Sequence, residues 1–202
     1  MQPLSSAITG ALDRAATPPN LTGPPLGETA SGRSLTASEA RDRLLAATPQ
    51  ETDQRLLTWL KSQGVVATPE VRLTYPATGG YRRDLTGFSF SGLSPAVQAW
   101  AVTAAVSAMT PATQDDCEGW IATMHACMAH RGSSETAVEL VLSLYAARLR
   151  MYPADVAKAV CMAFTLRRDK PNWFPTLSEV DEACEAATEK RAALLKSLQG
   201  AA

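Results

Sequence analysis

Apolar residues recur at helical spacing through most of residues 94–198, in segments that are separated by prolines and short polar breaks. Val97, Trp100 and Ala104 mark one face of the first segment, and comparable stripes follow in the later ones. Most segments begin at Ser or Thr beside Pro, or at a capping box. The pattern predicts a five-helix C-terminal domain with helices at about 94–110, 113–130, 134–151, 152–168 and 176–198.

The third of these segments, 134–151, is apolar on more than one face. Its large side chains are Val138, Leu140, Val141, Leu142, Leu144, Tyr145 and Leu149. A helix that is apolar all round is normally buried on all sides. We therefore expect this helix at the centre of the bundle.

Two further helices are predicted in residues 34–64. Thr36-Ala37-Ser38-Glu39 and Thr48-Pro49-Gln50-Glu51 each place Thr three residues before Glu, which is the spacing of a capping box. Pro49 suits the first helical position because its missing N–H costs nothing there. The second helix is expected to stop near Gly64, and together the two predict a small helical hairpin.

Residues 65–93 show a different pattern. Val71, Leu73 and Tyr75 alternate with polar residues, Thr78-Gly79-Gly80 offers a turn, and apolar alternation returns at Phe88 and Phe90. Both a β-hairpin and an extended connector fit this pattern, and the sequence does not decide between them.

Tyr81, Arg82 and Arg83 follow the glycine turn, so an aromatic ring lies beside two cations. Such a trio can stack on a nucleic-acid base and contact phosphate, and these are the candidate nucleic-acid-binding residues. Solvated charges on a loop are the simpler interpretation.

Residues 1–33 are rich in Pro, Gly, Ser, Thr and Ala. Such a segment buries too little apolar surface to offset the entropy of ordering it, so it predicts a flexible N-terminal arm. The predicted fold class is therefore mostly α, with a disordered arm before the helical hairpin.

Composition narrows the functional classes. Hydrophobic residues make up 46% of the 202, and 19 Lys and Arg balance 20 Asp and Glu, giving a net charge of −1. This excludes nucleic-acid binding through overall positive charge. No apolar run reaches the roughly 18 residues of a membrane span, and the four widely spaced cysteines are typical of reduced thiols. We expect a cytosolic protein with no membrane partner.

The strongest metal-like cluster is Cys117, His125, Cys127 and His130. On one straight helix these side chains point around most of the circumference, and only Cys127 and His130 share a face. We therefore expect no bound zinc.

Catalytic patterns are also missing from the sequence. It contains no Gly-rich phosphate loop, no nucleophile elbow and no His-Glu-x-x-His pair. Asp115, Asp116 and Glu118 fall at the start of a predicted helix, where carboxylates favour the positive end of the helix dipole. We expect neither an enzyme nor a cofactor.

The connector before the last helix holds Trp173, Phe174 and Pro175. Two large aromatics in a stiff loop either fill a gap between helices or anchor a partner. Three cations precede them, and the next helix begins with acidic residues, a charge arrangement that suits a protein contact. The candidate partner-binding residues are Arg167, Arg168, Lys170, Trp173, Phe174 and Pro175.

The run Tyr152-Pro153-Ala154-Asp155-Val156, the basic end Arg167-Arg168-Asp169-Lys170 and the following Pro171-Asn172-Trp173-Phe174-Pro175-Thr176-Leu177-Ser178-Glu179-Val180 resemble phage-type replicative helicase loaders. That group includes the phage lambda replication protein P and small all-helical phage loaders. The match spans about 151–195. It implies a non-catalytic phage or prophage replication protein of the bacterial cytosol that binds the replicative helicase and helps load it on single-stranded DNA.

Two other classes stay open. A regulatory or DNA-binding adaptor would present Arg167, Arg168 and Lys170 to phosphate, and its DNA binding would depend strongly on salt. A structural phage component would work by self-assembly and form concentration-dependent oligomers.

Overall fold

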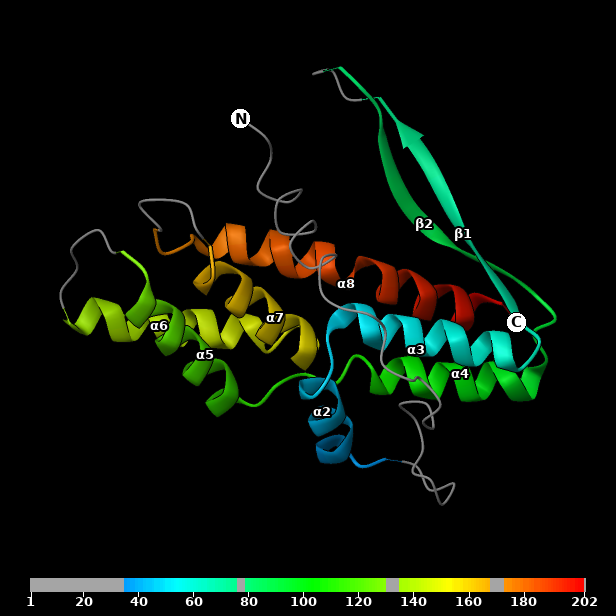
Figure 1. Ribbon diagram of the computed structural model, residues 1–202, viewed down its shortest axis with the longest axis horizontal. Helices are drawn as coiled ribbons and strands as arrows, with labels where there is room; N and C mark the ends of the chain where they lie inside the picture. The colour runs from blue at the N-terminus through cyan, green and yellow to red at the C-terminus, as the bar shows by residue number, and fades with distance from the viewer. Residues whose placement is uncertain (1–34, 76–78, 130–134, 168–172, 202) are drawn as a thin grey trace.

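The computed structural model describes residues 35–75, 79–129, 135–167 and 173–201. Seven helices and one two-stranded antiparallel sheet lie in these ranges (Figure 1), which confirms the mostly helical fold class. Within the same ranges, no helix combines the length and apolar character needed to cross a bilayer. The elements are α2 (Ala37–Leu45), α3 (Pro49–Ser62), β1 (Val66–Thr74), β2 (Arg82–Ser91), α4 (Pro95–Ser107), α5 (Gln114–Cys127), α6 (Glu135–Leu149), α7 (Ala154–Thr165) and α8 (Leu177–Gly200).

The helix starts follow local chemistry. The capping boxes predicted at Thr36 and Thr48 are confirmed, and another forms at Thr176. In each box the Thr side chain accepts the backbone N–H of a Glu three residues on, and the Glu side chain accepts the Thr backbone N–H. A further box forms at Thr113 with Asp116. Asp116 is thus a capping residue, which explains one member of the acidic group at the start of α5.

Residues 66–74 and 82–91 pair as the two strands of a β-hairpin, and do not form an extended connector. Val66 pairs with Ser91 and Thr74 with Arg82, and one irregularity lies between Glu70 and Val71. The hairpin extends away from the helices as an arm (Figure 1). At its base Gly92 has a φ of +81°, and a Cβ there would lie 2.8 Å from the Gly64 carbonyl oxygen, so this junction requires glycine.

α7 is the central helix of the fold, and α2, α3, α5 and α8 all pack against it. Leu44, Leu56 and Leu60 belong to the same buried core as the helices after residue 94. The core therefore runs across the predicted boundary at 94. The autonomy of the 94–198 segment stays a prediction, and the N-terminal arm 1–33 lies outside the described residues.

A buried arginine joins α8 to α3 and α7. Arg191 is 1% exposed; its Nε donates to Asp53 at 2.8 Å and its two terminal nitrogens to Asp155 at 3.0 and 2.8 Å. The same nitrogens donate to the carbonyl oxygens of Ala108 and Pro49. Burial lowers the pKa of Arg191, but the hydrogen bonds and charges of Asp155 and Asp53 together outweigh it and leave that pKa above its ordinary value.

The prediction that segment 134–151 lies at the centre is wrong. α6 packs against α5 and α8 at the margin of the helical body, with Tyr145, Ala146 and Leu149 buried. Leu140 and Leu144 are exposed on its other side. The centre is taken by α7, whose alanines at 154 and 157 let neighbouring helices approach closely.

Candidate partner-binding connector and hairpin arm

The connector between α7 and α8 is attached to the end of α5. Trp173 forms a parallel bridge with Ala129, and the Phe174 N–H donates to the Ala129 carbonyl oxygen at 3.0 Å. These bonds fix the connector backbone just before the capping box at Thr176 starts α8.

Phe174 and Pro175 fill the space between α5, α6 and α8. The Phe174 ring centroid lies 5.3 Å from that of Tyr145 and 5.4 Å from that of His125. Pro175 is buried, and its carbonyl oxygen accepts the Tyr145 hydroxyl at 2.7 Å. Burial of Tyr145 raises its pKa to about 12, so this hydroxyl stays a donor. The gap-filling interpretation therefore holds for Phe174 and Pro175.

Trp173 differs from the two residues that follow it, because 44% of its surface is exposed. The anchor interpretation therefore fits Trp173 alone among the three. A neighbouring cation, Arg167, lies 5.3 Å from the centroid of the Phe164 ring at the end of α7. Arg168 and Lys170 lie outside the described residues.

The acidic start of α8 is partly compensated. Asp181 accepts the Arg148 Nε on both carboxylate oxygens, at 2.7 and 2.8 Å, and also accepts the Tyr152 hydroxyl at 3.1 Å. The charge contrast expected along this edge is therefore reduced at Asp181.

The tip of the hairpin arm brings together two of the three predicted nucleic-acid residues. Tyr81 is exposed, and the Arg83 guanidinium lies 6.0 Å from its ring centroid. Arg82 instead pairs with Asp84 at 2.6 Å, and Asp84 also accepts the Thr74 hydroxyl. The charge of Arg82 is thus balanced within the arm, and of the three candidate residues only Tyr81 and Arg83 form a stacked pair.

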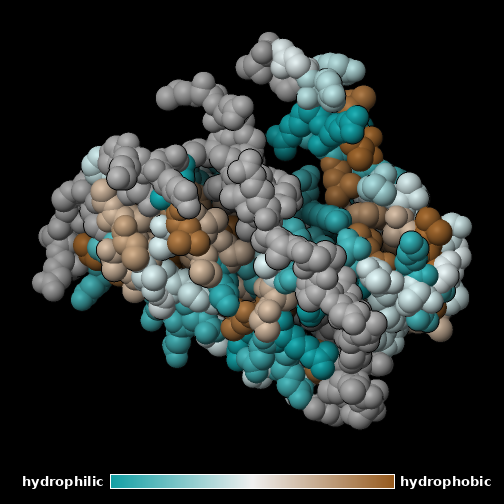
Figure 2. All heavy atoms as spheres, in the orientation of Figure 1, coloured by the Kyte–Doolittle hydropathy of each residue, from teal (hydrophilic) through white to brown (hydrophobic). Residues whose placement is uncertain are grey.

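The face that carries Tyr81 and Arg83 is otherwise apolar, because strand residues alternate between faces. Val71, Leu73 and Tyr75 share it and are exposed. Figure 2 shows hydrophilic residues over the arm and hydrophobic ones along one of its sides. This face suits stacking and apolar contact better than a purely phosphate surface.

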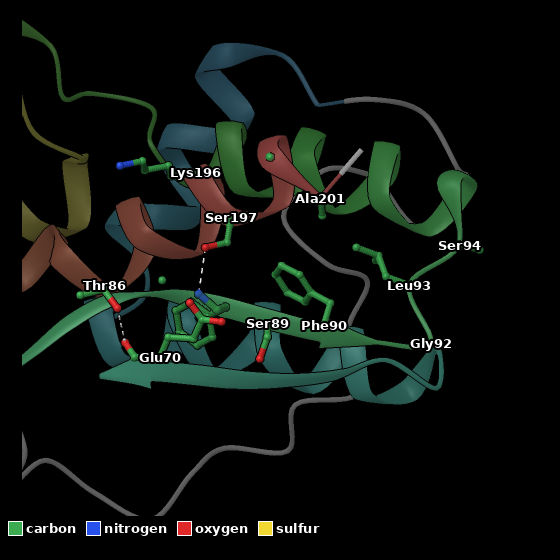
Figure 3. A pocket seen from close by; sticks show the side chains of 13 residues that line it. Glu70, Thr86, Ser89, Phe90, Gly92, Leu93, Ser94, Lys196, Ser197 and Ala201 are labelled. Carbon is green, nitrogen blue, oxygen red and sulfur yellow. Dashed lines mark hydrogen bonds between the residues drawn. The ribbon is translucent and has the colours of Figure 1, made fainter. Parts of the chain in front are cut away.

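A hollow of about 680 Å³ lies at the base of the arm, between β2, the end of α8 and the start of α4 (Figure 3). Phe90 and Leu93 point into it. Ser197 is uncharged, and its hydroxyl oxygen accepts the Phe88 N–H at 2.8 Å. Among its described lining residues only Glu70 and Lys196 are charged. The hollow therefore offers apolar and hydroxyl contacts without an assembled acid–base pair.

The two described cysteines of the metal-like cluster lie in different environments of α5. Cys117 is buried and Cys127 exposed, and His130 lies outside the described residues. In the described part of the chain, no three His, Cys, Asp or Glu side chains are placed to hold a metal. Burial raises the pKa of Cys117 to about 11 and that of Cys161 to about 12, so these thiols stay protonated.

Sequence analysis did not identify the residues that support the connector. Ala129 and Tyr145 lie far from it in the chain and meet it only through the packing of α5 and α6. No local pattern marks them, since both are ordinary helix-compatible residues.

No family model matches this chain, and comparisons with curated proteins and with solved structures find no significant match either.

Proposed function

We propose that this protein is a non-catalytic adaptor of the phage replicative helicase-loader type, which binds the helicase at the Trp173 connector and helps place it on single-stranded DNA. The observation that carries the proposal is a half-exposed tryptophan on a fixed backbone. Trp173 is 44% exposed, while the next two residues are packed and hydrogen-bonded into the body. The resemblance of the chain to the loaders, over about 151–195, includes this connector.

A fixed tryptophan is well suited to anchor a partner. Interface hot spots are enriched in Trp, and truncating one typically costs more than 1 kcal/mol of binding free energy. Because the backbone at Trp173 and Phe174 is already bonded to Ala129, an anchor at Trp173 requires little further ordering of the backbone at these two residues. The connector thus combines a large apolar contact with a low entropic cost.

The test measures both affinity and stability of the full chain. Trp173→Ala should weaken binding to the purified hexameric replicative helicase of a bacterial host by about fivefold or more, which corresponds to roughly 1 kcal/mol. Its melting temperature should stay close to wild type, since the side chain is half-exposed. Tyr75→Ala is the matched control, because it removes an exposed aromatic from the arm instead.

Two results would contradict the proposal. In the first, wild-type chain shows no helicase binding. In the second, Trp173→Ala loses folding stability in proportion to affinity, as truncation of a buried aromatic does at about 3–5 kcal/mol.

A second candidate function, DNA binding by an adaptor, is favoured by the stacked pair at the arm tip. Tyr81 and Arg83 offer a ring and a guanidinium on one exposed face. Arg83→Ala should then weaken binding to an oligothymidine strand and reduce the salt dependence by about one phosphate contact. Arg82→Ala should have a smaller effect, because Asp84 already balances that charge.

A further inference from the structure

The outer part of the hairpin arm exposes two tyrosine rings to solvent. Tyr75 is 76% exposed and Tyr81 64%, and Leu73, on the same face, is about half-exposed. The arm projects from the helical body (Figure 1), so the helices do not cover these rings. The rings contribute little buried area to the fold, and large apolar side chains gathered on one exposed face mark an interaction surface.

The two tyrosines occupy facing positions at the end of the arm. The register pairs Leu73 with Arg83 and Thr74 with Arg82, so the next facing positions along the two strands are those of Tyr75 and Tyr81. Side chains that face each other across an antiparallel pair are neighbours on one side of the sheet. Two exposed rings therefore lie at the end of this face, and the Arg83 guanidinium is 6.0 Å from the centroid of one of them.

The outer part of the arm is also locally basic. Residues 71–75 and 79–84 contain three arginines and one aspartate, whereas the whole chain has a net charge of −1. Asp84 is paired with Arg82 at 2.6 Å, on the side of the arm opposite the tyrosines. Arg83 keeps its guanidinium beside the Tyr81 ring. A positive end on a slightly acidic chain is complementary to an anionic partner.

We propose that Tyr75 and Tyr81 form a stacking platform for two bases of a single-stranded nucleic acid, with Arg83 on a phosphate of the same strand. Aromatic rings stack on bases of any sequence, and aromatics on neighbouring strands of a sheet can hold two or three bases. This inference rests on the DNA-binding part of the proposed function. It adds Tyr75 as a binding residue and specifies that the strand is unpaired.

The chemistry of the platform favours an unpaired strand over a duplex. Inside a duplex the faces of a base are covered by its neighbours in the stack, so the tyrosine rings have no base face to contact. A duplex is bound largely through its phosphates, and the tyrosine face offers a single arginine, Arg83. An unpaired strand presents base faces and phosphates together, which matches two rings beside one guanidinium.

The first experiment measures binding of the full chain to a fluorescently labelled oligothymidine of about 12 nucleotides, within the length that single-strand sites cover. Tyr75→Ala and Tyr81→Ala should each raise the dissociation constant about fivefold or more, the lower end of the loss of one stacked base. Tyr75→Phe keeps the ring and should bind within about twofold of wild type, since stacking needs no hydroxyl.

Val66→Ala is the matched control. Val66 is an exposed apolar residue of the same strand, but it lies at the base of the arm and on the opposite face from Tyr75. Its replacement should leave oligothymidine binding unchanged. The melting temperatures of the tyrosine variants should stay close to wild type, because both side chains are exposed. A wild-type chain that does not bind oligothymidine, or alanine variants that bind it as well as wild type, overturns the proposal.

The second experiment separates the bases from the phosphates. An abasic strand of the same length keeps every phosphate and lacks the rings that stack. Wild type should bind it about tenfold or more weakly than oligothymidine, and should also bind the oligothymidine–oligoadenosine duplex more weakly than the single strand. A chain that lacks both tyrosines should bind the abasic and base-containing strands alike. Equal binding of these two strands by wild type would show a phosphate contact without stacking, and overturns the platform.

The outcomes distinguish this proposal from the proposed function. Both experiments contain no helicase, so a chain that fails to bind helicase can still show the platform. If Arg83→Ala weakens strand binding but the tyrosine variants do not, DNA binding stands and the platform is wrong. If wild type binds no strand and Tyr75→Ala releases the purified helicase, the tyrosine face contacts protein and the platform is equally wrong. We expect Tyr75→Ala to lose strand binding and to keep helicase binding, which is measured without DNA.

Discussion

α6 and α7 are consecutive apolar helices of 15 and 12 residues, yet they have different environments. α7 is enclosed by α2, α3, α5 and α8, and most of its residues are buried. α6 contacts α5 and α8 and leaves Leu140 and Leu144 exposed. Apolar character around a helix therefore shows how much surface needs cover, but not whether the same chain supplies that cover.

The largest expected effect is on the free energy of unfolding, and it comes from the buried arginine that holds α7 to its neighbours. Arg191→Ala removes the partner of Asp155 on α7 and of Asp53 on α3, and leaves two carboxylates in a buried site. Removing one partner of such a buried pair costs about 3–5 kcal/mol, which urea unfolding can measure. Lys190→Ala, at an exposed neighbour, should change the unfolding free energy by less than about 0.5 kcal/mol. If Arg191→Ala lowers the unfolding free energy no more than this small change, the buried network is not stabilising.

Replacing leucine by alanine at two positions of α6 compares how much each face of the helix contributes to the free energy of unfolding. Leu149 is 0% exposed, so Leu149→Ala should cost about 2–5 kcal/mol of unfolding free energy. Leu140→Ala, measured on dilute protein by the same denaturant titration, should cost less than about 0.5 kcal/mol. Comparable losses at the two positions would mean that the outer face of α6 is covered within the monomer.

Alkaline pH tests the contact between α6 and the connector. Tyr145 has a pKa of about 12 in the fold, raised by burial from 10.0, so folding favours the neutral hydroxyl. Its contribution is complete below pH 10 and is lost as pH rises through about 12. Tyr145→Phe should lower stability near neutral pH by roughly 0.5–1.5 kcal/mol and reduce the fall in melting temperature between pH 10 and 12. An identical alkaline fall in both proteins would contradict this assignment.

The smallest expected effect is on the reactivity of the cysteine thiols, and it leaves the fold intact. Cys161 of α7 is 2% exposed and burial raises its pKa to about 12, so it should resist iodoacetamide at neutral pH. The exposed Cys127 should react first, and its alkylation should not shift the melting temperature. Mass spectrometry of tryptic peptides distinguishes the two sites. Rapid labelling of Cys161 in native protein would show that α7 is less enclosed than its packing indicates.

The sequence was sufficient for features set by local chemistry. Helices start at Thr36, Thr48 and Thr176 through side-chain hydrogen bonds to the residue three positions further along the chain. Their capping boxes can therefore be recognised in the sequence without knowledge of the tertiary structure. The hairpin was harder to assign, because Pro69 and the irregularity after Glu70 interrupt the strand pattern. Local patterns identified the elements but not their neighbours.

Long-range packing explains what sequence analysis missed. Lys190-Arg191 resembles any solvated pair of charges, although Arg191 falls on the apolar stripe of α8 with Cys184, Leu194 and Leu198. That position is the one signal that marks it as buried. At the candidate site, the two interpretations of the connector apply to different residues: Phe174 packs, and Trp173 is half-exposed. Only the tertiary contacts with Ala129 and Tyr145 separate them.

The buried arginine also sets an order for biosynthesis. A ribosome makes Asp53 and Asp155 well before it makes Arg191, so the emerging chain holds two carboxylates whose shared counter-charge has not yet been translated. Until α8 leaves the exit tunnel, burying those carboxylates is unfavourable, and α3 and α7 cannot settle into their final packing. We therefore expect a nascent chain stalled before residue 191 to remain sensitive to protease, and one released after α8 to become resistant.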